Sequence, residues 1–554
     1  MARWILACRV EGQGFGCFPG DSSFVTRTGM AVETLEGLGM LDALKDKTSL
    51  IRYLKSMQQP DGGFIEAPDY FHGKLPPWGT MSALEPTWWA IKTLIKLGAM
   101  PDNPEGAKEF IMARQFECGA WDSYELGWNT SRTRAMLYST FWAVAALREL
   151  GASIPDSVAL VRWVGSMRDP DPNSSGYSLG DRVFVFYSPQ GAYYAVRTLD
   201  LLGDKPDNPA AIKKFLLSDK GQEADGGFEM GQGDGWNNYD HFSRMVDTYA
   251  AVNALDLLGL PLSDSDSSKA AHPATDCVSW VVGIQNSDGG FPRFGVTSQT
   301  PLPGPSEMRS TWQAVAVIKL LDRETPVPKN PVQPVNEVVV HRPKYLYPAI
   351  DNDDPAQVWA YRRIALPIYN HFLEKTGSRI EALGGLTRWA RAAVGPMNAA
   401  FATGGRSLLM HGFGQCGQMS QMLQLLASSV DHAARFSYIT GDITAEILVR
   451  EDDWDRPHWC LFIPFTNEWP DPDVAAPDGS RNGWSALDLT LDYRNRRRTL
   501  NYPSRTEVGD NCFISIRVET VDHQRGTWGR EIVIDTTSSY TSAEAAALYP
   551  GQSW

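Results

Sequence analysis

TWWAIKTLIKLG, residues 87–98, is the stretch that decides the fold, because a word of the same form occurs six times before residue 323. Counted from its first residue, each copy has alanine at the fourth position, leucine or isoleucine at the eighth and leucine at the eleventh. This spacing predicts an amphipathic helix with one packing face, and the glycine that ends most copies predicts a helix stop. The copies cover 28–39, 87–98, 140–151, 192–203, 248–259 and 311–322.

A second word, Gln-x-x-x-Gly-Gly-aromatic, precedes most of these helices. Its glycines predict a tight turn after an outer helix, its glutamine can bind exposed backbone groups, and its aromatic side chain can pack into the neighbouring repeat. The helix words recur with a period of 52 to 63 residues, so six helix pairs are expected to close a ring. The copies are 58–64, 115–121, 222–228 and 285–291, with degenerate copies near 15–18 and 175–177.

Residues 1–325 therefore resemble the alpha-alpha barrel of the terpenoid cyclase and protein prenyltransferase families. The resemblance implies an (α/α)6 barrel and a small-molecule, lipid-like substrate.

The chemistry of those families is only partly matched. Where class II terpenoid cyclases carry the acid motif DxDD, the sequence reads RMVD at 244–247, and only Asp247 remains. Where prenyltransferase beta subunits carry zinc ligands as D-x-C, Asp247 is followed by Thr248 and Tyr249. We therefore expect no catalytic zinc and no other cofactor, and we interpret Asp247 as a helix cap or a buried hydrogen-bonding residue.

Aromatic residues cluster just after the starts of the predicted inner helices. They could line a site for an apolar chain or a cation, or simply fill the barrel core, and the sequence leaves both possibilities open. A polar and aromatic loop over 234–241 is expected near the same mouth. The aromatic residues are Trp88, Trp89, Phe141, Trp142, Tyr193, Tyr194, Tyr249 and Trp312.

The other chemical signal is Gly414-Gln415-Cys416-Gly417-Gln418, a glycine-flanked cysteine before a helical apolar pattern at 419–426. Cys416 is expected at the helix N-terminus, where unpaired N–H groups and the helix dipole favour a thiolate. His458 and Asp488 follow on two strand-like segments. This order suits a thiol enzyme in which the histidine takes the thiol proton and the aspartate orients the histidine.

The words around these residues resemble the transglutaminase-like (papain-like) cysteine enzyme superfamily over roughly 385–495. The resemblance implies that Cys416 is the nucleophile, His458 the general base and acid, and Asp488 the orienting residue. It also makes Trp389 a candidate for stabilising the oxyanion. The matching words are Gln415-Cys416, Ala434-Arg435, His458-Trp459 and 483–490, with Leu489 in place of the family's proline.

A competing alignment sets 441–446 against the strand that carries the family's histidine. Asp442 would then replace the histidine and Ile463 the aspartate, and the site would be inactive. We prefer the first alignment because it accounts for the word at 483–490.

Length and composition set the domain plan. The 554 residues are too many for one ordinary domain, and a composition of 43% hydrophobic and 21% charged residues is typical of soluble proteins. We expect a barrel over 1–322, a proline-rich linker over 323–349 and an α+β transglutaminase-like domain over 350–554, with helices at 355–374 and 378–395. The acidic word DNDD at 351–354 has the letters of DxDD but lies outside the repeats.

A net charge of −14 argues against a nucleic-acid binder, and no apolar run suggests a membrane span. Seven scattered cysteines without a CxxC motif favour a reducing cytoplasm. The oligomeric state stays open.

Three functions remain possible from the sequence. The leading hypothesis is a thiol enzyme that transfers an acyl group to water or an amine, with the barrel holding a hydrophobic or peptide-like substrate. The second is a terpenoid cyclase-like enzyme that acts in the barrel or at the domain interface. The third is a non-catalytic interaction protein.

Overall fold

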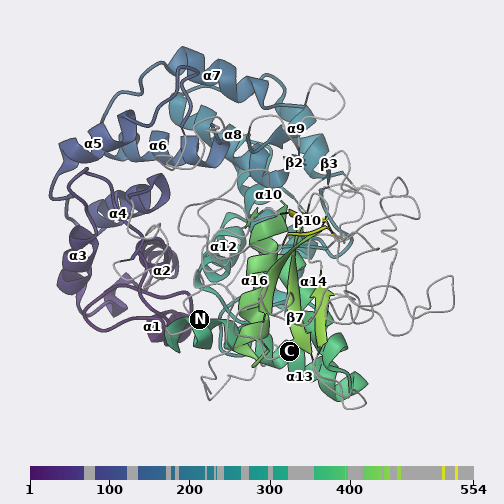
Figure 1. Ribbon diagram of the computed structural model, residues 1–554. Helices are drawn as coiled ribbons and strands as arrows, with labels where there is room; N and C mark the ends of the chain where they lie inside the picture. The colour runs from purple at the N-terminus through teal and green to yellow at the C-terminus, as the bar shows by residue number, and fades with distance from the viewer. Residues whose placement is uncertain are drawn as a thin grey trace. The chain divides into compact units, whose positions relative to one another are not determined.

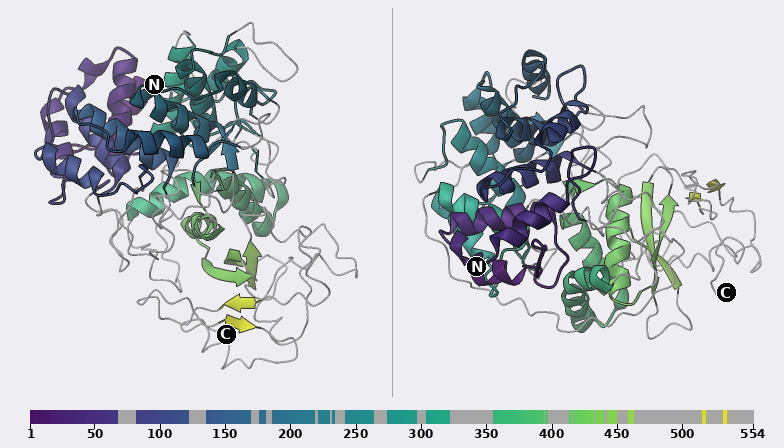
Figure 2. Two further views of the ribbon diagram at one scale, coloured as in Figure 1. Left: turned by 90° about the horizontal axis from the view of Figure 1, so that it is seen from above. Right: turned by 90° about the vertical axis from the view of Figure 1, so that its left-hand side faces the viewer.

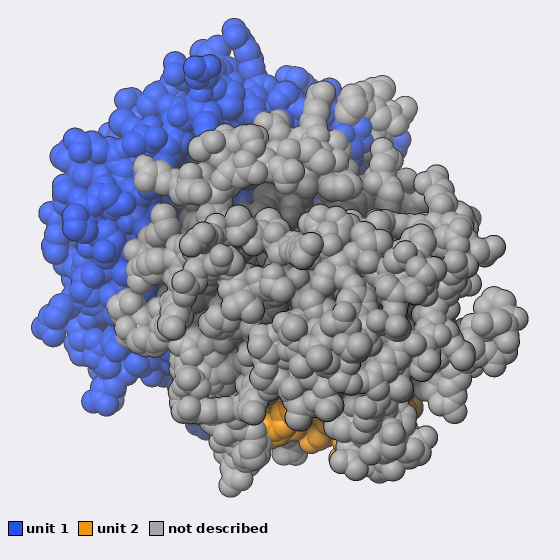
Figure 3. Space-filling view, viewed as in Figure 1, with its two compact units in different colours: residues 1–71, 77–297, 303–333 blue, residues 72–76, 298–302, 334–554 orange. Residues whose placement is uncertain are grey.

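The computed structural model divides into two compact units, coloured separately in Figure 3. The first comprises 1–71, 77–297 and 303–333, and the second 72–76, 298–302 and 334–554. The predicted boundaries at 322 and 350 fall outside the described residues and stay predictions. The structure describes residues 1–67, 82–121, 135–169, 176–180, 186–218, 221–229, 232–233, 242–263, 274–296, 304–321, 355–393, 395–396, 413–414, 416–432, 434–439, 442–449, 458–462, 515–517 and 531–533.

The first unit is a double ring of helices. Each inner helix packs against the inner helix of the next repeat, and α12 packs against α2, so the ring closes as the sequence predicts (Figure 1). The inner helices are α2 (Val25–Gly37), α4 (Leu84–Lys96), α6 (Leu137–Glu149), α8 (Pro189–Leu202), α10 (Met245–Leu257) and α12 (Met308–Leu320). The outer helices are α1 (Ala2–Ala7), α3 (Lys47–Ser56), α5 (Pro104–Met112), α7 (Ser157–Ser166), α9 (Pro209–Leu216) and α11 (Ala274–Gly283).

The threonine that opens five of the six helix words connects its inner helix to the turn that precedes it. Its hydroxyl accepts a hydrogen bond from the backbone N–H of the aromatic residue in the preceding turn, as between Phe64 N and Thr87 Oγ1 at 2.9 Å. The same bond joins Phe228 N to Thr248 Oγ1 at 3.0 Å. The inner helices begin about one turn before the threonine, so the bond holds the turn against the first turn of the helix.

The glutamine and glycines of the second word act as predicted. Gln58 Nε2 donates to the carbonyl oxygen of Gly62 at 2.9 Å and to that of Asn103, which caps the next outer helix. Gly226 has a φ of +90°, and a Cβ at that position would lie 2.5 Å from the carbonyl carbon of Asp276. Only glycine therefore allows the turn to approach α11 this closely.

Shorter elements complete the first unit. A 3₁₀ turn, η1 (Leu41–Ala43), follows α2. The strands β1 (Tyr177–Ser178), β2 (Phe186–Ser188) and β3 (Gln232–Gly233) form an antiparallel sheet in that order.

The second unit combines helices with short strands. Its helices α13 (Pro355–Thr376) and α14 (Arg379–Ala393) agree with the predicted helices and pack against α16 (Cys416–Ser429). Helix α16 also packs along an antiparallel sheet, β6 (Ala434–Ile439), β7 (Asp442–Val449) and β8 (His458–Phe462) (Figure 2). The remaining strands are β4 (Gly395–Pro396), parallel to β5 (Phe413–Gly414), and β9 (Ser515–Arg517), antiparallel to β10 (Glu531–Val533).

These findings confirm the predicted ring of helix pairs. The assignment of the second unit to a transglutaminase-like α+β fold stays a prediction. The linker and the DNDD word at 351–354 lie outside the described residues. Of the helices that the structure describes, none has the length and apolar character needed to cross a membrane.

Candidate functional site

The predicted aromatic residues of the inner helices form a continuous belt. We define the aromatic belt as Trp88, Trp89, Phe141, Tyr193, Tyr249 and Trp312. Neighbouring rings touch from helix to helix, with centroid separations of 5.1 Å for Trp88–Phe141, 6.2 Å for Phe141–Tyr193, 5.5 Å for Tyr193–Tyr249 and 4.8 Å for Tyr249–Trp312. The belt therefore joins α4, α6, α8, α10 and α12.

The belt closes across α2, which contributes no aromatic residue. Trp312 of α12 contacts Trp89 of α4 directly, with centroids 5.4 Å apart, although α2 lies between these helices in the ring. The contact is possible because α2 has Gly29 at this level, where a Cβ would lie 2.3 Å from Trp89 Cε3. A contact that bypasses α2 places the belt on the inner side of the ring.

Two further predicted residues lie next to the belt. Trp142 pairs with Tyr138 at a centroid separation of 4.9 Å, and Tyr194 lies 5.6 Å from the ring of Phe141. Trp142 is buried, whereas Tyr194 is partly exposed. These residues extend the aromatic belt toward the starts of α6 and α8.

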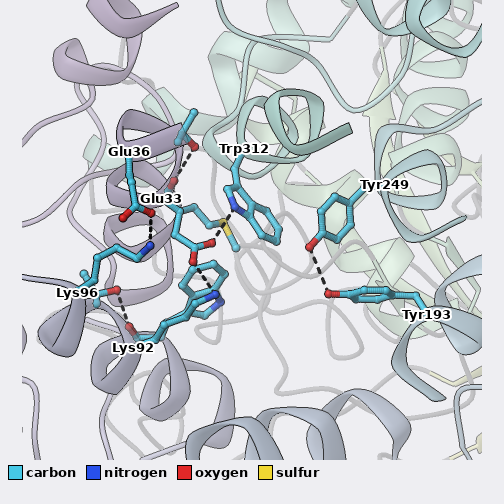
Figure 4. A network of polar contacts seen from close by, with 11 residues as sticks. Glu33, Glu36, Lys92, Lys96, Tyr193, Tyr249 and Trp312 are labelled. Atoms are coloured by element: carbon cyan, nitrogen blue, oxygen red, sulfur yellow. Dashed lines mark hydrogen bonds and ion pairs between the residues drawn. The ribbon is translucent and has the colours of Figure 1, made fainter. Parts of the chain in front are cut away.

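A charged pair lies beside the belt, about one turn further along the inner helices. Lys92 Nζ is 2.5 Å from Glu33 Oε1 and lies over the rings of Trp88 and Trp89, 4.7 and 5.3 Å from their centroids. The indole nitrogen of Trp312 donates to Glu33 Oε2 at 3.1 Å. Figure 4 shows these side chains converging from α2, α4 and α12.

Two tyrosine hydroxyls of the belt form a hydrogen bond between α8 and α10. The Tyr193 and Tyr249 oxygens are 3.2 Å apart, as Figure 4 shows. Burial raises the pKa of both phenols, so both keep their protons at neutral pH. Two hydroxyl protons share this one hydrogen bond, so among the described residues one of them has no acceptor.

Asp247 lies on α10 two residues before Tyr249. It is fully buried, and its Oδ1 accepts a hydrogen bond of 2.8 Å from Gln190 Nε2 on α8. Neither Asp247 Oδ2 nor Gln190 Oε1 has a partner among the described residues. Burial raises the pKa of Asp247 to about 6, against the weaker opposing effects of Arg244 and Gln190.

Further ionisable groups lie near the helix starts, between α2, α4 and α12. Arg309 Nη2 donates to Glu85 Oε1 at 2.7 Å. Glu66 accepts hydrogen bonds from the hydroxyl and the backbone N–H of Thr26, and burial raises its pKa to about 8. The Arg309–Glu85 and Lys92–Glu33 ion pairs thus lie on opposite sides of the aromatic belt.

The structure therefore brings together the predicted residues of the first unit. Glu33, Lys92 and Gln190 were not predicted, because each lies in an ordinary helical pattern beside apolar residues. Their position in the repeat could have identified Glu33 and Lys92 as neighbours, because both stand five residues after the threonine of their helix word. No group of three or more histidine, cysteine or acidic side chains in the described part of the chain is arranged to hold a metal ion. The predicted loop at 234–241 lies outside that part.

Of the predicted triad of the second unit, Cys416 and His458 are described only in their backbone. Helix α16 begins at Cys416, as the sequence predicts, and His458 lies at the start of β8, within the predicted strand-like segment. Asp488 lies outside the described residues. Trp389 is buried in α14, and its suggested role in stabilising an oxyanion stays a prediction.

Strand pairing separates two of the competing residues. In the β7–β8 register His458 pairs with Val449, at the end of β7 opposite Asp442. Eight residues of strand span about 25 Å at roughly 3.3 Å each.

The start of α16 lies at the Asp442 end of this sheet. A short turn with a positive φ at Asp431 joins α16 to β6, and α16 packs on both β6 and β7. A helix and a strand that are joined by a short turn and packed together run antiparallel. Cys416 therefore lies at the end where β6 stops and β7 begins. The choice between His458 and Asp442 for the family's histidine position stays a prediction.

Comparison with known proteins supports the first unit alone. The prenyltransferase alpha-alpha toroid domain matches residues 1–74, 80–182 and 186–345. No curated protein sequence matches the chain.

Three of the solved structures that match the chain are distantly similar to it. A D-mannose isomerase is 14% identical, with a TM-score of 0.40, over 58% of this chain and 94% of that chain. Candida albicans protein geranylgeranyltransferase-I complexed with GGPP is 14% identical, with a TM-score of 0.28, over 42% and 83%. The type II terpene cyclase MstE from Scytonema is 14% identical, with a TM-score of 0.27, over 56% and 77%. TM-scores this low carry no argument about activity. The family match, which spans more than half of the chain, does identify it: the chain belongs to the prenyltransferase alpha-alpha toroid family.

Proposed function

We propose that the toroid binds the apolar part of a lipid-like molecule against the aromatic belt, and that Asp247 protonates it, as in a terpenoid cyclase-like enzyme. The observation that carries this proposal is the state of Asp247. One of its oxygens is held by Gln190, the other has no partner among the described residues, and its pKa is raised to about 6. A buried carboxyl group that keeps its proton in weak acid is suited to general acid chemistry.

The belt supplies the complementary property. Transfer of the Asp247 proton to an alkene carbon breaks the carboxyl O–H bond, forms a C–H bond and leaves a positive charge on the ligand. Aromatic faces attract such a charge, and Tyr249 and Tyr193 lie within about one helical turn of Asp247 and Gln190. Attack of a second alkene of the same ligand on this cation forms a C–C bond and closes a ring. Loss of a proton from the resulting cation to water gives a neutral product and hydronium, and hydronium returns the proton to the Asp247 carboxylate.

The test is incubation of the full chain with an all-trans C20 polyprenyl alcohol, and separately with its diphosphate, between pH 5 and pH 8. We expect cyclised products that increase as the pH falls through about 6 and that disappear in Asp247→Asn. Asp256→Asn is the matched control, because Asp256 is exposed on the same helix. Equal product from Asp247→Asn and the parent, or no product from either substrate at pH 5, would remove the proposal.

Acyl transfer by Cys416 is the second candidate function. It is favoured by the start of α16 at this residue, because N–H groups at a helix start stabilise a thiolate and can hold an oxyanion. The sheet register weighs against His458 as its partner. A chain without either activity would fit the third possibility, a non-catalytic interaction protein.

A further inference from the structure

The residues around the Glu33–Lys92 pair have unused hydrogen-bond donors. Lys92 has three N–H groups, and within the described residues Glu33 is its only polar partner. Its side chain is 26% exposed, so solvent or a ligand can reach it. The indole N–H of Trp88 is buried without a partner among the described residues.

Both oxygens of the Glu33 carboxylate already accept a hydrogen bond. Glu33 Oε1 receives Lys92 and Glu33 Oε2 receives Trp312. Among the described residues, the Tyr193–Tyr249 pair adds one more hydroxyl proton without an acceptor, on the α8–α10 side of the belt. A polar group of the ligand placed here meets more unused donors than acceptors, so we expect it to accept hydrogen bonds.

The charges of Lys92 and Glu33 decide whether the accepting group of the ligand is neutral or anionic. Lys92 and Glu33 neutralise each other, so an anionic group beside Lys92 would also lie close to the Glu33 carboxylate. A neutral oxygen avoids that repulsion and still accepts from the ammonium group. We infer that the belt takes a molecule whose apolar body carries a neutral oxygen acceptor, such as a ketone or ester carbonyl, which binds at Lys92.

This inference rests on the proposed binding of an apolar ligand by the belt and adds a second contact to it. Lys92 stands five residues after the threonine of its helix word, whereas Asp247 stands one residue before the threonine of its own. Six residues along parallel inner helices amount to about 9 Å of axial rise. The oxygen bound at Lys92 is therefore a different group from the carbon that Asp247 protonates.

The experiment compares heptadecane, 2-heptadecanone and hexadecanoate as competitors of the neutral fluorescent probe Nile red, using the full chain. In the parent we expect the ketone to bind about tenfold more tightly than the hydrocarbon and more tightly than the carboxylate. Lys92→Met should reduce the ketone-to-hydrocarbon ratio to about one. Lys96→Met is the matched control, because Lys96 pairs with Glu36 between the same two helices, one helical turn beyond Lys92.

A second variant guards against a folding defect. Lys92→Met leaves Glu33 without its cation, whereas Glu33→Gln combined with Lys92→Met leaves no unpaired charge and should give the same ratio of about one. A ratio near one in the parent, equal ratios in Lys92→Met and Lys96→Met, or tighter binding of hexadecanoate than of the ketone would overturn the inference. Equal binding of all three ligands would leave the proposed function standing, whereas failure of all three to displace Nile red would remove both.

Discussion

The two units differ in how far local sequence signals extend into tertiary structure. In the first unit the same helix word occurs six times, and five copies make the same threonine bond to the turn before them. In the second unit each signal occurs once. The helix at Cys416 and the strand at His458 both form, but the sheet places them at different ends.

The difference shows that repetition carries tertiary information that a single motif lacks. A contact between one repeat and the next is encoded again in every copy, so the pattern predicts the packing as well as the helices. A cysteine, a histidine and an aspartate far apart in one sequence predict local structure only. Their meeting depends on strand order and register.

The largest expected effect compares the loss of stability when a glycine is replaced in a packed turn of the first unit and in an open turn of the second unit. Gly226→Ala should reduce the free energy of unfolding of the first unit by about 3–5 kcal/mol, because Gly226 has a φ of +90° and its Cβ would meet the backbone of Asp276. Gly377→Ala should cost only about 1 kcal/mol, since Gly377 has a φ of +71° and nothing within 4 Å. Hydrogen exchange under denaturant measures each unit separately, and equal costs would contradict the packing argument.

The second effect is the pH dependence that Asp247 gives the first unit. Its pKa rises from the ordinary 3.8 to about 6 on folding, so the folded protein holds a proton that the unfolded chain releases. The free energy of unfolding should therefore fall as the pH rises from about 4 to about 6, by about 3 kcal/mol for a shift of roughly two units.

Asp247→Asn should remove this dependence and stabilise the first unit at pH 7, because an amide can keep the bond from Gln190 without a buried charge. Denaturant melts at pH 4 and pH 7 measure the difference. If the free energy of unfolding of the variant depended on pH as in the parent, another group would be responsible for the pH dependence.

A smaller effect compares two buried threonines, one in each unit. Thr248→Val should cost about 1–3 kcal/mol, because it leaves the buried N–H of Phe228 without its acceptor. Thr387→Val should cost less than about 1 kcal/mol, because the Thr387 hydroxyl only donates to the carbonyl of Leu383 in its own helix. Similar costs would mean that the bond to the turn does not hold the repeat.

The smallest expected effect concerns the thiol. The sheet register predicts that His458→Ala changes the rate of Cys416 alkylation by less than about twofold at any pH, because His458 lies at the far end of β7. Mass spectrometry of each alkylated cysteine against pH measures the rate. A tenfold loss of Cys416 reactivity would instead establish the predicted Cys–His pair. The sequence would then have predicted a tertiary contact in the second unit as well as in the first.

The sequence by itself determined the inner helices, the turns and the closed ring, because each depends on patterns that repeat within about 60 residues. It also predicted a helix that begins at Cys416 and a strand that contains His458. Tertiary structure alone decided the network of Glu33, Lys92 and Trp312, whose outer members lie 279 residues apart and meet only when α12 packs on α2. It likewise decided the pairing of Gln190 with Asp247 and the register that separates His458 from Asp442. The physical reason is that helical spacing fixes which face a residue occupies, whereas its partner is fixed by the neighbouring element that folding brings beside that face.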